Sequence, residues 1–165
     1  MALLMLFGGL RSSEVLALRM GDIDLGRCTV RVWGKGATER VVPIDAGTAR
    51  VIHHYVLYER PDVERPELFL VLKGKQKGQP LTTAGLRTIF RYHRERSGVI
   101  LGNPHRLRHT YGTNMAEAGV DIQTLKELMG HASIDSTTQY VHLSAAHLRR
   151  EYDAALRKLK GDDHE

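Results

Sequence analysis

Residues 103–140 read NPHRLRHTYGTNMAEAGVDIQTLKELMGHASIDSTTQY, and this stretch predicts the helices around which the chain is organised. Asn103 suits the N-cap of a helix, and Pro104 suits the first helical position, where its missing N–H costs nothing. Gly119 lies where a glycine commonly ends a helix in the left-handed conformation. A second, shorter helix is expected over residues 122–129. The stretch therefore predicts two successive helices with short connections.

The same stretch carries side chains suited to phosphodiester chemistry. His105 and Arg108 are three residues apart, so the predicted helix places both on one face. Gly130 ends the second helix and presents His131, and a following turn carries Tyr140. Attack on a phosphodiester needs groups of these kinds: imidazoles, a guanidinium and a phenol. We therefore expect these side chains to converge on one site.

Near the start of the chain, an arginine lies at a predicted break between two buried helices. The apolar residues 2–10 predict the end of one helix, and Ser12 and Ser13 are expected to cap the next. Arg11 is then held by backbone on both sides, and Glu14 is expected to brace this turn rather than perform chemistry. The alternative for Arg11 is an ordinary solvated surface residue.

Residues 28–33 and 40–44 form extended patterns on either side of a glycine-rich turn, which predicts a β-hairpin. Val30 and Val32 fall on one face of it. The turn holds Lys35 between two glycines, so its ammonium group can approach a ligand closely. The alternative is a solvated lysine that discourages pairing at the sheet edge.

Further helices are expected over residues 48–58, from residue 82 or 83 to about residue 97, and over residues 145–160, with a short apolar strand at residues 68–72. The inward residues expected in the first two of these helices are Val51, Ile52, Tyr55, Val56, Leu86, Ile89 and Phe90.

The charge balance favours a polyanionic partner. Lys and Arg number 24 against 19 acidic residues, a formal net charge of +5. On a DNA-binding face, basic side chains touch phosphates without reading the base sequence. The candidates for such contacts are Lys73, Lys75 and Lys77 in a loop and Arg87 and Arg91 on a helix. The alternative is a merely solvated basic surface.

The cysteine content and the apolar start bear on location. Cys28 is the only cysteine, so no internal disulfide can form and a cytoplasmic setting is the simple expectation. Residues 1–7 are apolar but too few to span a bilayer, and they lack the basic segment of a signal peptide. We expect no membrane partner.

Other chemistries are weakly supported. His105 and His109 have a spacing that can hold zinc, but the glutamate of an H-E-x-x-H site is missing and Arg108 between them would repel a cation. The sequence has no nucleophile elbow and no Walker-type phosphate loop. We therefore expect no metal, no cofactor and no small-molecule substrate.

Five motifs in order resemble the tyrosine recombinases, the family of phage integrases and Xer-like site-specific recombinases. The motifs are LRSSEVLAL at residues 10–18, GKG at 34–36 followed by ERVVP at 39–43, HRLRHT at 105–110, LMGH at 128–131 and TTQY at 137–140. The resemblance implies a mainly α fold with a small antiparallel β-sheet (α+β), residues 1–165 forming a single catalytic domain. It also implies an enzyme that cuts and rejoins double-stranded DNA without metal or ATP.

The resemblance assigns roles to the conspicuous residues. Tyr140 would be the nucleophile that forms a 3′-phosphotyrosine and releases a 5′-hydroxyl. Arg11 and Arg108 would clamp the nonbridging phosphate oxygens, because a guanidinium binds phosphate through a planar fork. Lys35 would protonate the leaving 5′-oxygen.

Three further residues receive supporting roles by the same resemblance. His105 would assist proton transfer at the tyrosine, and His131 would hydrogen-bond a phosphate oxygen. Glu14 would support the turn that holds Arg11.

The resemblance also implies parts beyond this chain. Family members carry an N-terminal DNA-binding domain and one or two helices before the first arginine, so we expect an N-terminally truncated catalytic domain. Without the phosphate contacts of that other half, DNA binding should be weak and salt-sensitive. The helix and tail over residues 145–165 would pack on their own domain or dock in a neighbouring subunit, the latter giving a homo-oligomer (a tetramer on DNA).

Two alternative functions stay open. The same site acting without a partner duplex would give a type IB topoisomerase-like nicking-closing enzyme. A chain that has lost activity would be a DNA-binding remnant.

Overall fold

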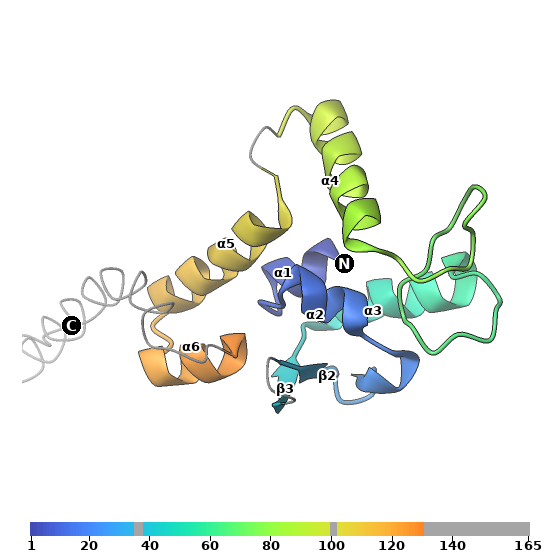
Figure 1. Ribbon diagram of the computed structural model, residues 1–165. Helices are drawn as coiled ribbons and strands as arrows, with labels where there is room; N and C mark the ends of the chain where they lie inside the picture. Colours follow the sequence, from blue (N-terminus) through green and yellow to red (C-terminus); the bar gives the residue numbers. More distant parts are fainter. Residues whose placement is uncertain (35–37, 100–101, 131–165) are drawn as a thin grey trace, which may run out of the picture. The chain divides into compact units, whose positions relative to one another are not determined.

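The computed structural model describes residues 1–34, 38–99 and 102–130 (Figure 1). The chain divides into two compact units, residues 1–111 and residues 112–165. The first unit holds two short N-terminal helices, a small sheet, two further helices and the first half of another helix. In the part of the chain that the structure describes, no helix is long and apolar enough to cross a membrane.

The chain starts with helices α1 (Ala2–Leu6) and α2 (Ser12–Ala17). They are separated at Gly9, whose φ of +65° is a left-handed conformation that glycine adopts without strain. The expectation that serines cap α2 is wrong, because Arg11 occupies the N-cap position and Ser12 begins the helix. A short 3₁₀ turn follows at Met20–Asp22.

A three-stranded antiparallel sheet follows, in the order β1 (Ile23–Asp24), β2 (Thr29–Trp33) and β3 (Glu39–Pro43). The predicted hairpin is confirmed, with Val30 paired to Val42 in the β2–β3 register. The predicted faces are also confirmed, since the β2 valines are buried while Arg31 and Trp33 are exposed. The short β1 had no recognisable pattern in the sequence.

Helix α3 (Ala46–His54) continues into a π-helical turn, η2 (Tyr55–Glu59). The helix starts earlier than predicted because the Asp45 carboxylate accepts a hydrogen bond from the backbone N–H of Thr48 at 2.9 Å, forming an N-cap. The predicted inward stripe is correct for Ile52, which is buried, and wrong for Val51, whose residue is 54% exposed.

The segment between α3 and α4 is irregular. The predicted strand at residues 68–72 is wrong, because its only ladder contact among the described residues is an isolated bridge between Leu70 and Pro80. Its apolar residues Leu68, Phe69 and Leu70 are buried all the same. Helix α4 (Thr83–Ser97) begins and ends as predicted: the Thr82 hydroxyl accepts from the N–H of Gly85 at 3.1 Å, and Leu86 faces inward.

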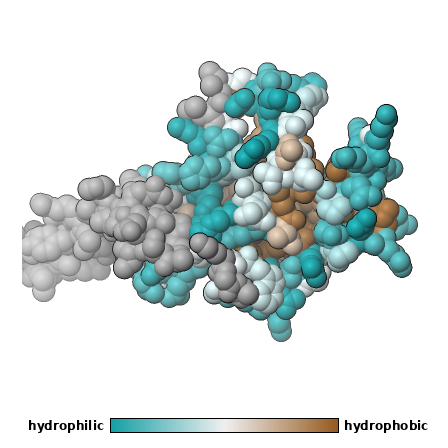
Figure 2. All heavy atoms as spheres, in the orientation of Figure 1, coloured by the Kyte–Doolittle hydropathy of each residue, from teal (hydrophilic) through white to brown (hydrophobic). Residues whose placement is uncertain are grey.

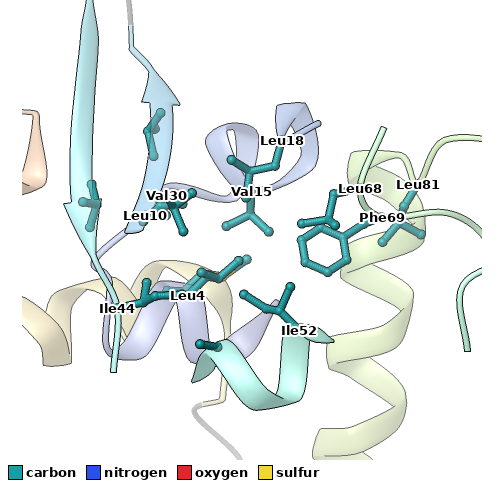
Figure 3. Close-up of a cluster of buried hydrophobic side chains, with 14 of the residues drawn as sticks. Leu4, Leu10, Val15, Leu18, Val30, Ile44, Ile52, Leu68, Phe69 and Leu81 are labelled. Carbon is teal, nitrogen blue, oxygen red and sulfur yellow. The ribbon is translucent and has the colours of Figure 1, made fainter. Parts of the chain in front are cut away.

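The core of the first unit draws side chains from all of these elements. Figure 3 shows Leu4 of α1, Val15 of α2, Val30 of β2, Ile52 of α3 and Leu68 of the irregular segment pointing toward one another. All five are buried, and Ile52, with 4% of its surface exposed, is the most accessible of them. Burial of each such side chain contributes roughly 1.5–3 kcal/mol, which fixes α2 and the hairpin side by side.

Helix α5 (Pro104–Glu117) crosses the boundary between the two units, and helix α6 (Ile122–Met129) lies in the second. The predicted cap of α5 is confirmed by a 3.0 Å hydrogen bond from the N–H of Arg106 to Asn103. The predicted end is confirmed by Gly119 at φ +90°.

The limits of α6 match the prediction. The Asp121 carboxylate caps its start by accepting from the N–H groups of Gln123 and Thr124. Gly130 ends it in the left-handed conformation, and Leu125 and Met129 are its buried residues.

Candidate active site

One buried carboxylate, that of Glu14, lies among three arginines. They come from the N-cap of α2 (Arg11), from β3 (Arg40) and from α5 (Arg108), and all belong to the first unit. The Glu14 side chain is 5% exposed. We call these four residues the arginine cluster.

Arg11 contacts Glu14 through both its backbone and its side chain. Its N–H donates to Glu14 Oε2 at 2.8 Å, and its Nη1 donates to Oε1 at 2.9 Å. The carboxylate therefore satisfies a backbone donor at the helix N-terminus while it orients the guanidinium. The Arg11 side chain is 38% exposed and is ion-paired to a buried carboxylate.

Arg108 is buried on α5, with 8% of its side chain exposed. Its Nη1 donates a short hydrogen bond to the carbonyl oxygen of Gly9 and lies 3.9 Å from Glu14 Oε2. The break between α1 and α2 thus supplies a backbone acceptor for an arginine 99 residues further along. Arg11 and Arg108 share Glu14 as an ion-pair partner.

Position 9 requires a glycine because the Tyr111 ring lies close to it, as well as because its φ is positive. A Cβ atom built on Gly9 would lie 2.4 Å from Cδ1 of Tyr111, one turn beyond Arg108 on α5. The aromatic ring therefore packs directly on the glycine backbone. This contact sets how closely α5 approaches the α1–α2 break, and so where Arg108 sits.

Arg40 was not among the residues that the sequence singled out. Its Nη1 and Nη2 donate to Glu14 Oε1 and Oε2 at 3.0 and 2.8 Å, and its side chain is 13% exposed. A signal was present: Arg40 alternates with Val42, which is buried, so it faces the core side of β3. An inward arginine in a strand requires a buried acid, and Glu14 is that acid.

The electrostatics of the cluster keep Glu14 ionised. Burial alone raises the pKa of Glu14, but hydrogen bonds from Arg40 and from the Arg11 N–H outweigh it and lower the pKa below the ordinary value of 4.5. Three guanidinium groups minus one carboxylate leave a formal charge of +2. Such a site is complementary to a phosphodiester, whose oxygens accept charge-assisted hydrogen bonds from arginine.

Tyr111 is the tyrosine of α5 and lies one turn beyond Arg108. Burial raises its pKa above the ordinary value of 10, although the charges of Arg108 and Arg40 act in the opposite direction. The residue is 3% exposed. Its burial and its contact with Gly9 suit Tyr111 to a packing role.

The two α5 histidines, His105 and His109, are exposed, whereas Arg108 is buried. Three predicted catalytic residues, Lys35, His131 and Tyr140, lie outside the described residues. Arg11, Glu14 and Arg108 are therefore the predicted residues that the structure brings together. The convergence of all six catalytic candidates stays a prediction.

The predicted DNA-contacting residues are exposed where the structure describes them. Arg87 and Arg91 lie on α4, and together with Arg94 they line a cavity of ≈ 290 Å³. Asn103 and Pro104, at the start of α5, line the same cavity. Hydrophilic residues gather at the top of the view in Figure 2, where the upper end of α4 lies in Figure 1. The three loop lysines, Lys73, Lys75 and Lys77, are exposed as well. Within the described ranges, no group of three or more His, Cys, Asp or Glu side chains could hold a metal ion.

Comparison with known proteins places this geometry in a family. The model of the phage integrase family matches residues 1–147. Tyrosine recombinase XerC of Proteus mirabilis is 35% identical over 153 residues, which covers 92% of this chain and 49% of that protein. Tyrosine recombinase XerA of Thermococcus kodakarensis is 37% identical over 163 residues, which covers 96% of this chain and 56% of that protein.

Solved structures have the same fold. A crystal structure of XerA recombinase superposes with a TM-score of 0.75 at 24% identity, covering 93% of this chain and 56% of that chain. The XerH site-specific recombinase bound to a palindromic difH substrate superposes with a TM-score of 0.72 at 27% identity, covering 92% and 43%. This chain spans about half the length of the relatives it matches.

The predicted fold class, mainly helical with a small antiparallel sheet, is thereby confirmed. The predicted family is confirmed as well, because the match extends over most of the chain and includes the arginine cluster. By these criteria, the chain belongs to the phage integrase family of tyrosine recombinases.

Proposed function

We propose that this chain is the catalytic domain, over residues 1–165, of a site-specific DNA recombinase that cuts and rejoins DNA strands. The observation that carries the proposal is the arginine cluster, in which a buried Glu14 orients Arg11 and lies 3.9 Å from Nη1 of Arg108, which donates to the carbonyl oxygen of Gly9. Preorganised guanidinium groups are effective where negative charge grows in a transition state, as on the nonbridging oxygens of a phosphodiester under attack.

The proposed first step is an in-line transfer of the scissile phosphoryl group. The hydroxyl oxygen of Tyr140 attacks phosphorus, the bond from phosphorus to the 5′-oxygen breaks, and a 3′-phosphotyrosine forms. Lys35 donates the proton that the leaving 5′-oxygen needs, and His105 assists removal of the tyrosine proton. Arg11 and Arg108 stabilise the charge on the phosphate, with His131 donating a further hydrogen bond.

The second step reverses the first with a different strand. A 5′-hydroxyl of a second DNA attacks the phosphotyrosine, which restores the phosphodiester and releases Tyr140. The covalent link conserves the bond energy, so the cycle needs neither ATP nor a cofactor. The groups on the phosphate supply the positive charge without a metal.

Double-stranded DNA is the proposed substrate and partner. The exposed arginines of α4 and the loop lysines support this, because they add positive charge outside the cluster. A relative, XerH, has been solved bound to its difH substrate. We further propose a homo-oligomer, a tetramer on DNA formed through residues 145–165, acting in the cytoplasm.

A library of nicked duplexes with random sequence tests the proposal, because a nick beside the cut site lets the short product diffuse away and traps the covalent adduct. We expect DNA covalently attached to the wild-type chain and none on Tyr140→Phe. Exchange of strands between two captured duplexes would identify recombination. Relaxation of supercoiled DNA without exchange would instead identify a nicking-closing enzyme. A folded chain that binds DNA and forms no adduct would overturn the proposal.

A further inference from the structure

We propose that Arg40 is a positioning residue of the arginine cluster, which occupies the carboxylate of Glu14 and so keeps that carboxylate from pairing closely with Arg108. This inference rests on the proposed function, since it assigns phosphate to the cluster. It adds a residue of β3 to a site otherwise built from the N-cap of α2 and from α5.

The Arg40–Glu14 pair is bidentate and buried. Two N–H groups of one guanidinium donate to the two oxygens of one carboxylate, at 3.0 and 2.8 Å, and the side chains are 13% and 5% exposed. Such a fork fixes the plane of the carboxylate as well as its position. The two residues are 26 positions apart, so the pair ties β3 to α2.

Glu14 lies closer to Arg11 and Arg40 than to Arg108. A carboxylate offers about four lone-pair sites. Arg11 fills two of them through its N–H and Nη1, and Arg40 fills two through its own fork. Arg108 Nη1 remains 3.9 Å from Oε2. With these acceptor sites taken, Arg108 donates to the carbonyl oxygen of Gly9 and keeps only a longer ion pair with Glu14.

Removal of the Arg40 guanidinium would change that balance. Two acceptor sites on a buried, ionised Glu14 would open, and a buried charge without its partner is costly. Glu14 would then form a closer ion pair with Arg108, whose Nη1 already lies 3.9 Å away. That pair would neutralise a guanidinium that otherwise stabilises the phosphate. The effect would fall on the transition state, where charge grows on the phosphate, and much less on binding of the rest of the DNA.

The experiment compares Arg40→Gln, Glu14→Gln, the double variant and Arg40→Lys, using single-turnover formation of the phosphotyrosine adduct on a captured duplex. Arg31→Gln is the matched control, because Arg31 lies on the adjacent strand, is exposed and pairs with Asp22. Circular dichroism checks that each variant folds, and Arg40→Lys replaces Arg40→Gln if the latter does not.

We expect Arg40→Gln to slow the adduct at saturating DNA by about tenfold with an unchanged Kd for DNA, since a charge-assisted hydrogen-bond pair is removed. In the Glu14→Gln background the same change should cost little, because the competing carboxylate is gone. Arg40→Lys should be intermediate, because a lysine engages the carboxylate as a point charge. Independent effects of the two substitutions, or an equal decrease in Arg31→Gln, would overturn the proposal.

A second readout separates this inference from the proposed function. Inorganic phosphate is titrated into the protein while the guanidinium signal of Arg11 is followed by NMR. We expect Arg40→Gln to bind phosphate several-fold more weakly and the double variant to recover. If the wild type forms no DNA adduct, the proposed function fails while this titration still decides the role of Arg40. Equal phosphate affinity in wild type and Arg40→Gln would refute the positioning role.

Discussion

Arg108 donates a hydrogen bond to the carbonyl oxygen of Gly9, a residue 99 positions earlier, at the break between the first two helices. The ring of Tyr111 packs against the same glycine, so closely that a Cβ atom would not fit there. One backbone position therefore sets both the depth of α5 and the direction of a guanidinium in the arginine cluster.

Gly9→Ala should destabilise the protein by about 3 kcal/mol, because a methyl group would collide with Tyr111 and would occupy a left-handed φ. Urea unfolding followed by circular dichroism measures this. Gly21→Ala is the control, since nothing lies within 4 Å of a Cβ placed there. Equal stability of Gly9→Ala and wild type would contradict the packing described above.

Tyr111→Phe should cost less than about 1 kcal/mol, because the ring, and not the hydroxyl, packs on Gly9, whereas Tyr111→Ala should cost about 3–5 kcal/mol. The same Tyr111→Phe protein should form the DNA adduct at the wild-type rate, in contrast to Tyr140→Phe. Unfolding curves and the nicked-duplex assay check the two statements. A Tyr111→Phe variant without adduct would mean that the buried phenol takes part in the reaction.

Arg108→Lys should slow adduct formation on the order of a hundredfold, because an ammonium cannot reach both the Gly9 carbonyl and a phosphate oxygen in the geometry of a planar fork. Arg106→Lys on the same helix is the matched control, since Arg106 is exposed. Single-turnover rates at saturating DNA make the comparison. A decrease confined to DNA affinity would assign Arg108 to binding rather than to the chemical step.

The stability of the protein should depend on pH through Glu14. Its pKa in the folded state lies below the ordinary value of 4.5, so the unfolded chain binds this proton more readily. The stabilisation is therefore fully present above pH 4.5 and is lost as pH falls through the lower, folded pKa. Unfolding free energies between neutral pH and about pH 3 should fall more steeply for wild type than for Glu14→Gln. Parallel curves for the two proteins would show that Glu14 is not the group concerned.

Removing Arg87 and Arg91 together should weaken DNA binding uniformly across sequences and lower its salt dependence, by about 0.9 in the log–log slope for each phosphate that is no longer neutralised. Fluorescence anisotropy at several salt concentrations measures the slope. The control is Arg27→Gln/Arg50→Gln, which removes the same charge from exposed positions on other elements. An identical slope for both double variants would assign the effect to net charge and not to α4.

Much of the local structure could be predicted from residue spacing. The cap at Asn103, the glycine ends of α5 and α6, and the start of α4 at Thr82 depend on residues within a few positions of each other. The prediction of a strand at residues 68–72 was wrong because strand formation depends on a partner that is distant in the sequence. An apolar run indicates burial, but a strand also needs a partner along its length, and Leu70 finds one only at Pro80 among the described residues.

By itself, the sequence determined the family, the order of the helices and hairpin, and the chemical identity of the arginines, because these depend on motifs and on periodicity along the chain. Only the tertiary structure decided that Glu14 is a shared partner of three arginines and that Arg40 is one of them. It also decided that the carbonyl oxygen of Gly9 accepts a hydrogen bond from Arg108. The physical reason is distance along the chain. The Arg40–Glu14 contact joins residues 26 positions apart, and the Arg108–Gly9 contact joins residues 99 positions apart. Such contacts form only when the burial of apolar side chains has brought α2, β3 and α5 together.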